Sequence, residues 1–292
     1  MLPVSLLLWL IAELAIYYHL ALGPGGLPAP AAGLAAILTL LFARALQNAG
    51  LWLLAGRHQA PGQKPGLRIM VGEYLAFIRT FLLVLPFERL WMPADRLAPM
   101  GRVVLLVHGY GCSRGVWYRL RQRLENAGCT VATVSLFPPF ISMGRMVPLL
   151  NERIEAVCRQ TGAKKLTLVG HSMGGLICRS YLARHGNERV AALITLATPN
   201  TGTELARLGI GQNAREMQPD SLWLRDMAAE KTTVPTIAYC NPCDNYVYPH
   251  DHQRLPGAHN VDLPPIGHLA MLYDRRVADL VVDACTTPER RS

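Results

Sequence analysis

Charged residues are scarce in this sequence of 292 residues, where Asp, Glu, Lys and Arg account for 17% against about 25% in a typical soluble domain. The scarcity is uneven, because Glu13 and Arg44 are the only charged side chains before Arg57. A Lys/Arg-rich block and a nucleic-acid-binding motif are also missing, although the formal net charge is +9. The positive charge therefore favours attraction to anionic lipid over binding to nucleic acid.

A second closely spaced pair of cysteines is missing as well. The seven cysteines are an odd number and are scattered through mostly apolar patterns, which favours buried thiols in a reducing compartment. Cys240 and Cys243 form a C-x-x-C, but a zinc site needs a second pair of ligands, and the sequence has no second such motif. A redox motif opens a helix, whereas this one follows a strand pattern. We therefore expect neither metal binding nor redox chemistry from this pair.

Two long apolar runs open the sequence. Residues 2–22 are long enough to cross a bilayer, and they lack the basic start of a secretory signal, which favours a retained membrane segment. Residues 29–55 form the second run, and the linker between the runs carries no charge. Four basic residues follow the second run: Arg57, His58, Lys64 and Arg68. This asymmetry predicts a helical hairpin with both ends in the cytoplasm; the alternative is a buried helical subdomain of a soluble protein.

A third apolar run, residues 69–86, carries Glu73 and Arg79. We interpret it as a helix that lies on the membrane or packs on the hairpin; if it crossed the bilayer, the rest of the chain would lie on the other side. Residues 93–99 are typical of a linker. The predicted division is thus an N-terminal hydrophobic helical membrane-anchor region, residues 1–92, and a body, residues 101–286, which is large enough to bury a core unaided.

Strand and helix patterns alternate through the body. The expected strands are residues 103–107, 130–134, 166–169, 191–196, 235–239 and 259–261. The expected helices are residues 117–127, 146–161, 176–185 and 269–284. This alternation predicts an α/β fold with a mostly parallel sheet and helices on both faces. Ligands in such sheets bind at the carboxyl ends of the strands.

The segment Gly170-His-Ser-Met-Gly-Gly175 lies between a strand pattern and a helix pattern. Gly-x-Ser-x-Gly in this setting is the nucleophile elbow, whose tight turn needs a glycine on each side of the serine. The turn presents the Ser172 hydroxyl at the carboxyl end of the strand, where the positive end of the helix faces it. We predict Ser172 as a catalytic nucleophile, because a glycine-rich phosphate loop would need a lysine that this segment lacks.

A serine nucleophile needs a histidine base, which follows the serine and the acid in this type of chain order. His268 lies on a loop before the final helix pattern, and we predict it as the base. His185 lies at the far end of the helix that starts at the elbow, and His259 lies inside a strand pattern. His250 and His252 remain alternatives.

The orienting acid should follow the strand that precedes the last strand. Asp244 has this place, so we predict it as the acid, with Asp251 and Asp262 as alternatives that are more typical of solvated or capping residues. His250, Asp251 and His252 could also form a metal-binding group, which we do not favour.

Hydrolysis also needs N–H donors for the developing oxyanion. The backbone N–H of Met173, directly after the nucleophile, is one predicted donor. The loop after the first strand of the body, residues 108–112, should supply the other, and we predict the N–H of Tyr110. His108 is expected to hold this loop in place.

These motifs resemble the bacterial lipase/esterase branch of the α/β-hydrolases. The resemblance spans residues 101–285 and is carried by Val107-His-Gly-Tyr-Gly111, Gly170-His-Ser-Met-Gly-Gly175, Ala197-Thr-Pro-Asn-Thr-Gly202, Cys243-Asp244 and Gly267-His268. It implies carboxylic-ester hydrolysis through an acyl-enzyme without a cofactor, and a site bordered by residues 197–199. Secreted members with a calcium site carry a carboxylate just after the catalytic histidine, where this sequence has Leu269-Ala270. We therefore expect no metal.

The leading hypothesis is a membrane-anchored serine ester hydrolase that acts on lipid-like acyl esters. Residues 201–227 are long enough for a modest apolar lid. The resemblance to a bacterial branch makes a bacterial inner membrane the expected place of the anchor, and the charge asymmetry around the hairpin places the catalytic domain in the cytoplasm. An acyltransferase or a thioesterase with the same triad is the alternative enzyme, and a membrane scaffold that has kept the fold is the non-enzymatic one.

Overall fold

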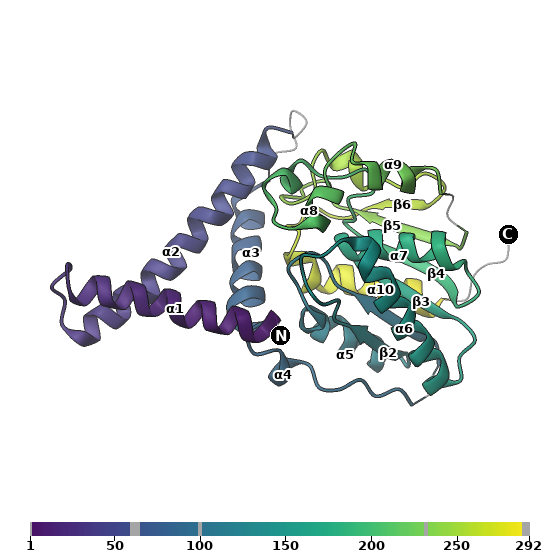
Figure 1. The fold of residues 1–292 in the computed structure, drawn as a ribbon, viewed down its shortest axis with the longest axis horizontal. Coiled ribbons are helices and arrows are strands. Elements are labelled where there is room, and N and C mark those ends of the chain that lie inside the picture. The colour runs from purple at the N-terminus through teal and green to yellow at the C-terminus, as the bar shows by residue number, and fades with distance from the viewer. Residues whose placement is uncertain (1, 59–64, 99–100, 231–232, 288–292) are drawn as a thin grey trace.

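One parallel six-stranded sheet forms the centre of the molecule (Figure 1). The computed structural model describes residues 2–58, 65–98, 101–230 and 233–287. The strand order is β2-β1-β3-β4-β5-β6, and every neighbouring pair is parallel. The strands are β1 (Val103–Val107), β2 (Thr130–Val134), β3 (Leu166–His171), β4 (Val190–Leu196), β5 (Thr236–Cys240) and β6 (His259–Asp262). The predicted parallel α/β sheet is confirmed, with small shifts at the strand ends.

Helices cover both faces of this sheet. Strand side chains alternate between the two faces, so Val104 and Leu106 belong to one hydrophobic core, whereas Leu105 belongs to another. Helices α5 (Tyr118–Asn126) and α10 (Arg275–Thr286) pack in the first core. Helices α6 (Met143–Thr161) and α7 (Met173–His185) pack in the second. Two short helices, α8 (Gln212–Glu216) and α9 (Leu222–Ala228), follow β4.

The predicted final helix, residues 269–284, is wrong at its start. The structure has a short 3-10 helix, η5 (Ala270–Leu272), and α10 begins only at Arg275. Asp274 has extended backbone and caps α10, because its side chain accepts hydrogen bonds from the backbone N–H groups of Arg276 and Val277. The cap separates the two helices and leaves His268 on a loop.

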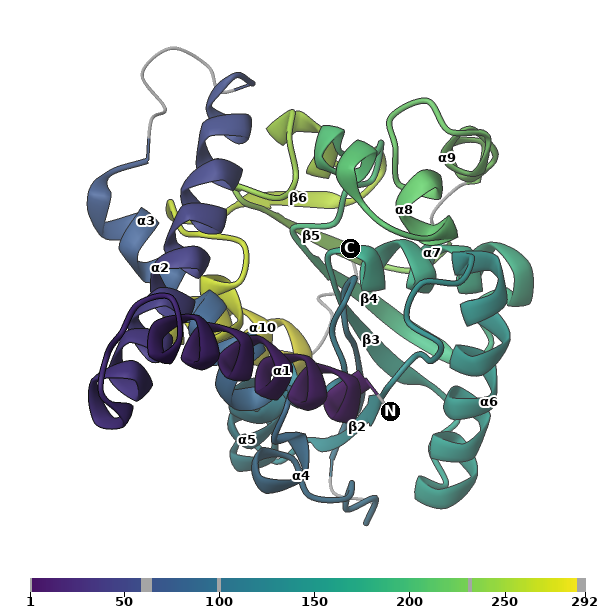
Figure 2. The ribbon, with the colours of Figure 1, turned by 60° about the vertical axis from the view of Figure 1, so that its left-hand side comes forward.

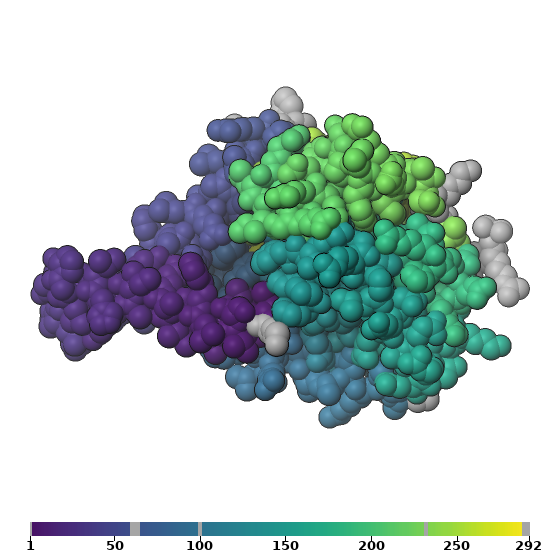
Figure 3. Space-filling view, viewed as in Figure 1, coloured from purple at the N-terminus to yellow at the C-terminus, as the bar shows by residue number. Residues whose placement is uncertain are grey.

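The first two apolar runs form a helical hairpin. Helix α1 (Leu2–Leu22) pairs with α2 (Ala29–Gly56), and both are long and apolar enough to cross a membrane by length and composition. Glu13 and Arg44 form an ion pair across the hairpin, so the two charged residues of this region neutralise each other. The turn of the hairpin projects away from the body, whereas the N-terminal end of α1 lies beside it (Figures 1 and 3).

The third apolar run forms helix α3 (Leu67–Ile78), which continues into a π-helical turn, η1 (Arg79–Val84). It packs on the hairpin, as one of the two predicted arrangements had it, and the Tyr74 hydroxyl donates to the Leu41 carbonyl at 2.9 Å. Another face of α3 packs on the body, because Ala76 and Phe77 belong to the same hydrophobic core as β1. This run thus joins the hairpin to the sheet (Figure 2).

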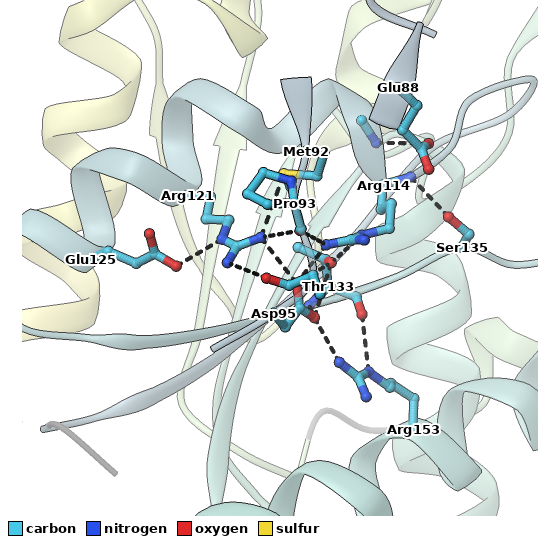
Figure 4. A network of polar contacts seen from close by, with 12 residues as sticks. Glu88, Met92, Pro93, Asp95, Arg114, Arg121, Glu125, Thr133, Ser135 and Arg153 are labelled. Atoms are coloured by element: carbon cyan, nitrogen blue, oxygen red, sulfur yellow. Dashed lines mark hydrogen bonds and ion pairs between the residues drawn. The ribbon is translucent and has the colours of Figure 1, made fainter. Parts of the chain in front are cut away.

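The segment predicted as a linker is closely bound to the body. It follows helix α4 (Glu88–Trp91), and its Asp95 side chain is 6% exposed and forms ion pairs with Arg114, Arg121 and Arg153 (Figure 4). The same carboxylate accepts from the backbone N–H of Thr133 in β2, at 2.7 Å. Three arginines around one carboxylate fix this part of the chain against the edge of the sheet. Lys64 of the predicted N-terminal region and Pro99 of the predicted linker lie outside the described residues.

Candidate active site

The serine of the Gly-x-Ser-x-Gly motif occupies a strained turn between β3 and α7. Ser172 has φ 55° and ψ −126°, a backbone conformation that residues with a side chain rarely adopt. A Cβ on Gly174 would meet the backbone of Val107 and His108, so the turn can approach β1 only with glycine there. The sequence therefore folds locally into the predicted elbow, and Met173 begins the helix directly after the serine.

The imidazole of His268 contacts two aromatic rings. Its centroid is 4.5 Å from that of His171, the residue before the serine, and 4.9 Å from that of Tyr246, which is stacked on it. The backbone of His268 is held as well, because its N–H donates to Asn245 Oδ1 at 3.2 Å and its carbonyl lies 3.2 Å from His171 Nε2. This side chain is 3% exposed, and its position is fixed from several sides.

Asp244 lies at the carboxyl end of β5 and has no exposed side-chain surface. Its Oδ2 is 2.8 Å from His268 Nδ1. Its Oδ1 accepts from the backbone N–H groups of Tyr246 and Val247, at 2.7 and 2.8 Å. One oxygen is thus occupied by backbone donors, and the other is directed at the imidazole, which is the geometry of an orienting acid.

The loop after β1 lies against the elbow. A Cβ on Gly109 would lie 3.0 Å from Ser172 Cβ, so the Gly109–Tyr110 peptide is next to the nucleophile. His108 is buried and accepts at Nε2 from the Leu136 N–H at 3.0 Å, while its Nδ1 lies 2.9 Å from the Gly109 carbonyl. This agrees with the predicted structural role of His108, and burial lowers its pKa, which keeps the ring neutral.

Ser172 and His268 open into one cavity of about 580 Å³. One wall is the segment after β4, where Leu205, Leu208 and Ile210 line the cavity. Both Leu208 and Ile210 are largely exposed, at 68% and 72%. The Tyr110 hydroxyl donates to the Ile210 carbonyl at 2.7 Å and accepts from its N–H at 2.9 Å. The segment predicted as a lid is thus bound to the loop beside the serine.

The hairpin forms another part of the wall of this cavity. Four residues from the first turns of α1 line it: Leu2, Leu6, Trp9 and Leu10. Arg44, Gln47 and Leu51 of α2 contribute as well, and Arg44 is neutralised there by its ion pair with Glu13. The cavity is therefore mostly apolar on the side of the hairpin.

The other sequence candidates do not line the cavity into which Ser172 opens. The Asp251 side chain is 95% exposed, and Asp262 pairs with Arg254 at the surface. His250 Nε2 lies 2.9 Å from the backbone carbonyl of Asp244, and His252 Nδ1 lies 3.0 Å from that of Gly202. Two further histidines are at the expected places, His185 at the end of α7 and His259 in β6.

The motif 197–199 lies behind the elbow. A Cβ on Gly175, in the first turn of α7, would collide with the Thr198 side chain, and the Ala197 N–H donates to the Tyr239 carbonyl at 3.0 Å. The residues that line the cavity do not include these three. The motif packs against the start of α7, directly after the elbow, whereas the resemblance implied that it borders the site.

Two carboxylates of the N-terminal region support the site, and sequence reasoning missed both. Glu73 has no exposed surface and accepts from the backbone N–H groups of Leu269 and Ala270, directly after His268. Glu88 accepts from the Gly115 N–H at 3.2 Å and from the Ser113 hydroxyl, in the segment that follows the loop after β1. The only sequence signal for Glu73 is a charged residue inside an apolar run. This pattern predicts that the carboxylate has a buried partner but does not identify the partner.

Burial dominates the electrostatics around the imidazole of His268. Desolvation raises the pKa of Glu73 from 4.5 to about 7, against the opposing effect of its two backbone donors. Burial, and then the nearby positive charge that His268 can carry, hold the pKa of His171 well below its usual value. His171 therefore stays a neutral hydrogen-bonding ring next to the base.

The described residues offer no evident metal site. Within residues 2–58, 65–98, 101–230 and 233–287, no group of three or more His, Cys, Asp or Glu side chains could hold a metal ion. All seven cysteines are buried thiols, and burial raises the pKa of the Cys240 thiol to about 11. The buried thiols predicted from the sequence are confirmed.

Comparison with known proteins relates the body to one family. A family model described as the alpha/beta hydrolase fold matches residues 102–228. A triacylglycerol lipase of Pseudarthrobacter phenanthrenivorans is 34% identical over 121 residues, which cover 39% of this chain and 38% of that lipase. The lysosomal thioesterase PPT2 of Mus musculus is 32% identical over 130 residues, which cover 41% of this chain and 42% of the thioesterase. The chain thus matches less than half the length of these relatives.

The likeness to a solved structure covers a larger part of the chain. The mature form of Bacillus licheniformis lipase BlEst2 aligns with a TM-score of 0.59 at 18% identity, and the alignment covers 68% of this chain and 97% of that chain. At this identity the likeness concerns the fold. The family model includes Ser172 and Tyr110 but ends before Asp244 and His268, so the support for the acid and the base is the 2.8 Å contact between them.

Proposed function

Because the body of this chain is an α/β-hydrolase of the lipase/esterase branch, we propose that it hydrolyses carboxylic esters of lipid-like substrates through an acyl-enzyme on Ser172. The observation that carries the proposal is the arrangement of Asp244, His268 and Ser172 at one end of the sheet. Asp244 Oδ2 lies 2.8 Å from His268 Nδ1, and His268 and Ser172 face the same cavity.

The chemistry follows from this order of groups. The hydroxyl of Ser172 attacks the ester carbonyl carbon while His268 Nε2 takes its proton, and Asp244 holds the proton on Nδ1. The carbonyl oxygen becomes an oxyanion, for which the N–H groups of Tyr110 and Met173 are the proposed donors. The imidazolium then gives its proton to the leaving alcohol. A water molecule, activated in the same way, releases the fatty acid and restores the serine.

The cavity supports an acyl chain as part of the substrate. Its walls combine leucine and isoleucine side chains of the lid segment with apolar side chains of α1. Burial of apolar surface stabilises a bound chain by about 0.8 kcal/mol per CH₂. The proposed substrates are therefore lipid-like acyl esters.

The hairpin is the proposed membrane anchor, with both of its ends and the body on the cytoplasmic side of a bacterial inner membrane. The surface of α1 that faces away from the body is apolar and exposed, as at Leu8, Ile11 and Ile16. The net charge of +9 favours the same membrane surface, because anionic lipids attract basic residues. Membrane lipid is thus proposed as the partner of the hairpin and as the source of the substrate.

The arrangement of α1 sets the depth of this anchor. Its first turns, up to Leu10, line the cavity, so only residues 11–22 extend beyond it. Twelve helical residues span about 18 Å, well short of the hydrocarbon core of about 30 Å. We infer that the hairpin enters one leaflet and holds the cavity at the membrane surface, whereas the sequence predicted a crossing.

A thioesterase or an acyltransferase is the alternative enzyme. The same acyl-enzyme forms in all three cases, and only the leaving group or the acceptor differs. The likeness to a thioesterase over 41% of the chain favours keeping this alternative. A non-enzymatic scaffold would not need the strained serine and the buried Asp244–His268 pair.

Labelling by a fluorophosphonate probe tests the proposal. The full-length protein in detergent should be labelled at one site and should cleave p-nitrophenyl esters, whereas Ser172→Ala should lose the label and several orders of magnitude in kcat. Near wild-type turnover by Ser172→Ala, or a wild type that neither reacts nor turns over, would contradict the proposal. Parallel assays with acyl thioesters and with alcohol acceptors separate the three enzyme classes.

A further inference from the structure

We propose that Glu73, in the N-terminal region, is a positioning residue for the catalytic base, so that α3 is part of the catalytic unit. The inference rests on the proposed function, because it concerns the histidine of the proposed triad. Glu73 lies 196 residues before Leu269 in the chain, and it belongs neither to the elbow motif nor to the motifs of the triad.

The contacts of Glu73 fall on the backbone that carries the base. Both carboxylate oxygens lie 3.0 Å from the Leu269 N–H, and Oε2 also accepts from the Ala270 N–H at 2.8 Å. These are the two peptide groups that follow His268. These hydrogen bonds join the Glu73 side chain to both peptide groups, so this side chain fixes the chain on the C-terminal side of the imidazole.

The neighbouring residue shows how closely this carboxylate fits. A Cβ on Gly267 would collide with Oε2 of Glu73 and would lie 2.6 Å from its Cβ. Any side chain at position 267 would therefore displace Glu73 or the loop. Gly267, before the base, thus leaves space for the carboxylate. Leu269 and Ala270, after the base, donate hydrogen bonds to the carboxylate.

The remaining backbone groups of His268 are held by other elements. Asn245 accepts from its N–H, and His171 Nε2 lies beside its carbonyl. The Asp244 carboxylate fixes the ring. Glu73 is the part of this arrangement that comes from outside the body, and without it the buried N–H group of Leu269 and the partly buried N–H group of Ala270 would lose this partner.

The helix periodicity explains why α3 can reach this loop. Glu73, Ala76 and Phe77 are the buried residues of α3, and the spacing of three and four places them on one face. Tyr74 lies on another face and donates to Leu41 of the hairpin. One face of α3 therefore contacts the catalytic loop, and another face contacts the anchor.

The test compares Glu73→Ala and Glu73→Gln with Tyr74→Phe, the matched control on the same helix, all in the full-length protein in detergent. The fluorophosphonate titrates the folded sites, and kcat is expressed per titrated site. We expect a fall of about tenfold to a hundredfold for Glu73→Ala, the scale of a small misplacement of a catalytic group, with KM within about twofold. Glu73→Gln keeps one acceptor oxygen and should lose less, whereas Tyr74→Phe should match the wild type.

These readouts separate positioning from a merely structural role. Loss of fold lowers the number of titrated sites and leaves the turnover of each remaining site unchanged, which would overturn the inference. If Glu73→Ala yields no titrated sites, Glu73→Gln decides, since it preserves volume: wild-type kcat per site would overturn the inference, and a severalfold fall would support it. An inactive wild type would overturn the proposed function and the inference together, whereas an active wild type with unaffected variants would overturn the inference alone.

Discussion

At the scale of single residues, the two carboxylate oxygens of Asp244 have different hydrogen-bond partners. Oδ1 is bound to the backbone N–H groups of Tyr246 and Val247, and Oδ2 faces His268. In Asp244→Asn the amide oxygen would keep the backbone donors, and the NH₂ group would face the imidazole. This NH₂ group would donate a hydrogen bond to Nδ1 of His268, so the ring proton would lie on Nε2. Nε2 must be unprotonated to take the proton of Ser172.

We therefore expect Asp244→Asn to lower kcat on the order of 10⁴ with the fold intact. Asp251→Asn is the matched control, because that side chain is 95% exposed and should be near neutral. The measurement is ester turnover per titrated site for both variants. The opposite order of effects would assign the acid to Asp251.

The buried carboxylate of Glu73 predicts a pH dependence of stability. Its pKa rises to about 7 through burial, so the native state holds a proton that the unfolded state releases near pH 4.5. Stability from this group is fully present below the unfolded pKa and is lost as the pH rises through the native pKa, by about 3 kcal/mol at most. The groups that face Glu73 are His268, Asp244, Tyr246 and Tyr273.

Comparison of the wild type with Glu73→Gln isolates this group. The glutamine is neutral at every pH, so the Tm of the wild type relative to the variant should fall between pH 5 and pH 8. Thermal unfolding of both proteins in the same detergent measures it. A Tm difference that stays constant over this range would show that Glu73 is not buried in the neutral form.

At the scale of elements, α3 and the chain up to Met92 pack as part of the body. Phe77, Leu85 and Met92 belong to the core that contains Leu106 of β1. Glu73 binds the loop after His268, and Glu88 binds the segment that follows the loop after β1. The predicted boundary between residues 92 and 101 remains a prediction, and this packing leads us to propose Leu67 as the start of the catalytic unit.

Two deletions test that boundary. Removal of residues 1–58 should leave a protein that still cleaves short esters, because α3 is retained. Removal of residues 1–92 should abolish folding or activity, since it exposes part of the core and deletes both carboxylates. Expression, thermal unfolding and p-nitrophenyl butyrate turnover of the two proteins provide the comparison. Equal activity of the two deletion proteins would support the boundary between residues 92 and 101 that the sequence predicted.

At the scale of the whole molecule, the hairpin decides where the cavity lies relative to the bilayer. Its turn projects from the body (Figure 3), and all seven native cysteines are buried. A cysteine introduced by Leu27→Cys, in the turn between α1 and α2, would therefore report accessibility without interference.

Insertion into one leaflet predicts that this cysteine stays unlabelled by a membrane-impermeant maleimide from either side of intact membranes and reacts once detergent is added. A cysteine introduced by Leu222→Cys, on the exposed surface of α9, is the control and should react from the cytoplasmic side. Labelling of the Leu27→Cys protein from the opposite side would establish a crossing hairpin, as the sequence predicted.

The sequence by itself determined the features that depend on local pattern. Apolar strand patterns between helices predict the parallel sheet, and Gly-x-Ser-x-Gly after a strand predicts the turn at Ser172, because steric limits on neighbouring residues act over a few positions. The order of Asp244 and His268 after the serine follows from the same topology, since parallel strands end at one edge of the sheet.

Only the tertiary structure decided the contacts between distant segments. No local pattern connects Glu73 with Leu269, Asp95 with Arg153, or the first turns of α1 with the cavity. A buried carboxylate in an apolar run indicates that a partner exists, but many backbone and side-chain donors could serve. The partner is selected when packing of the whole chain brings one pair of groups together, and that selection makes a helix of the N-terminal region part of the catalytic site.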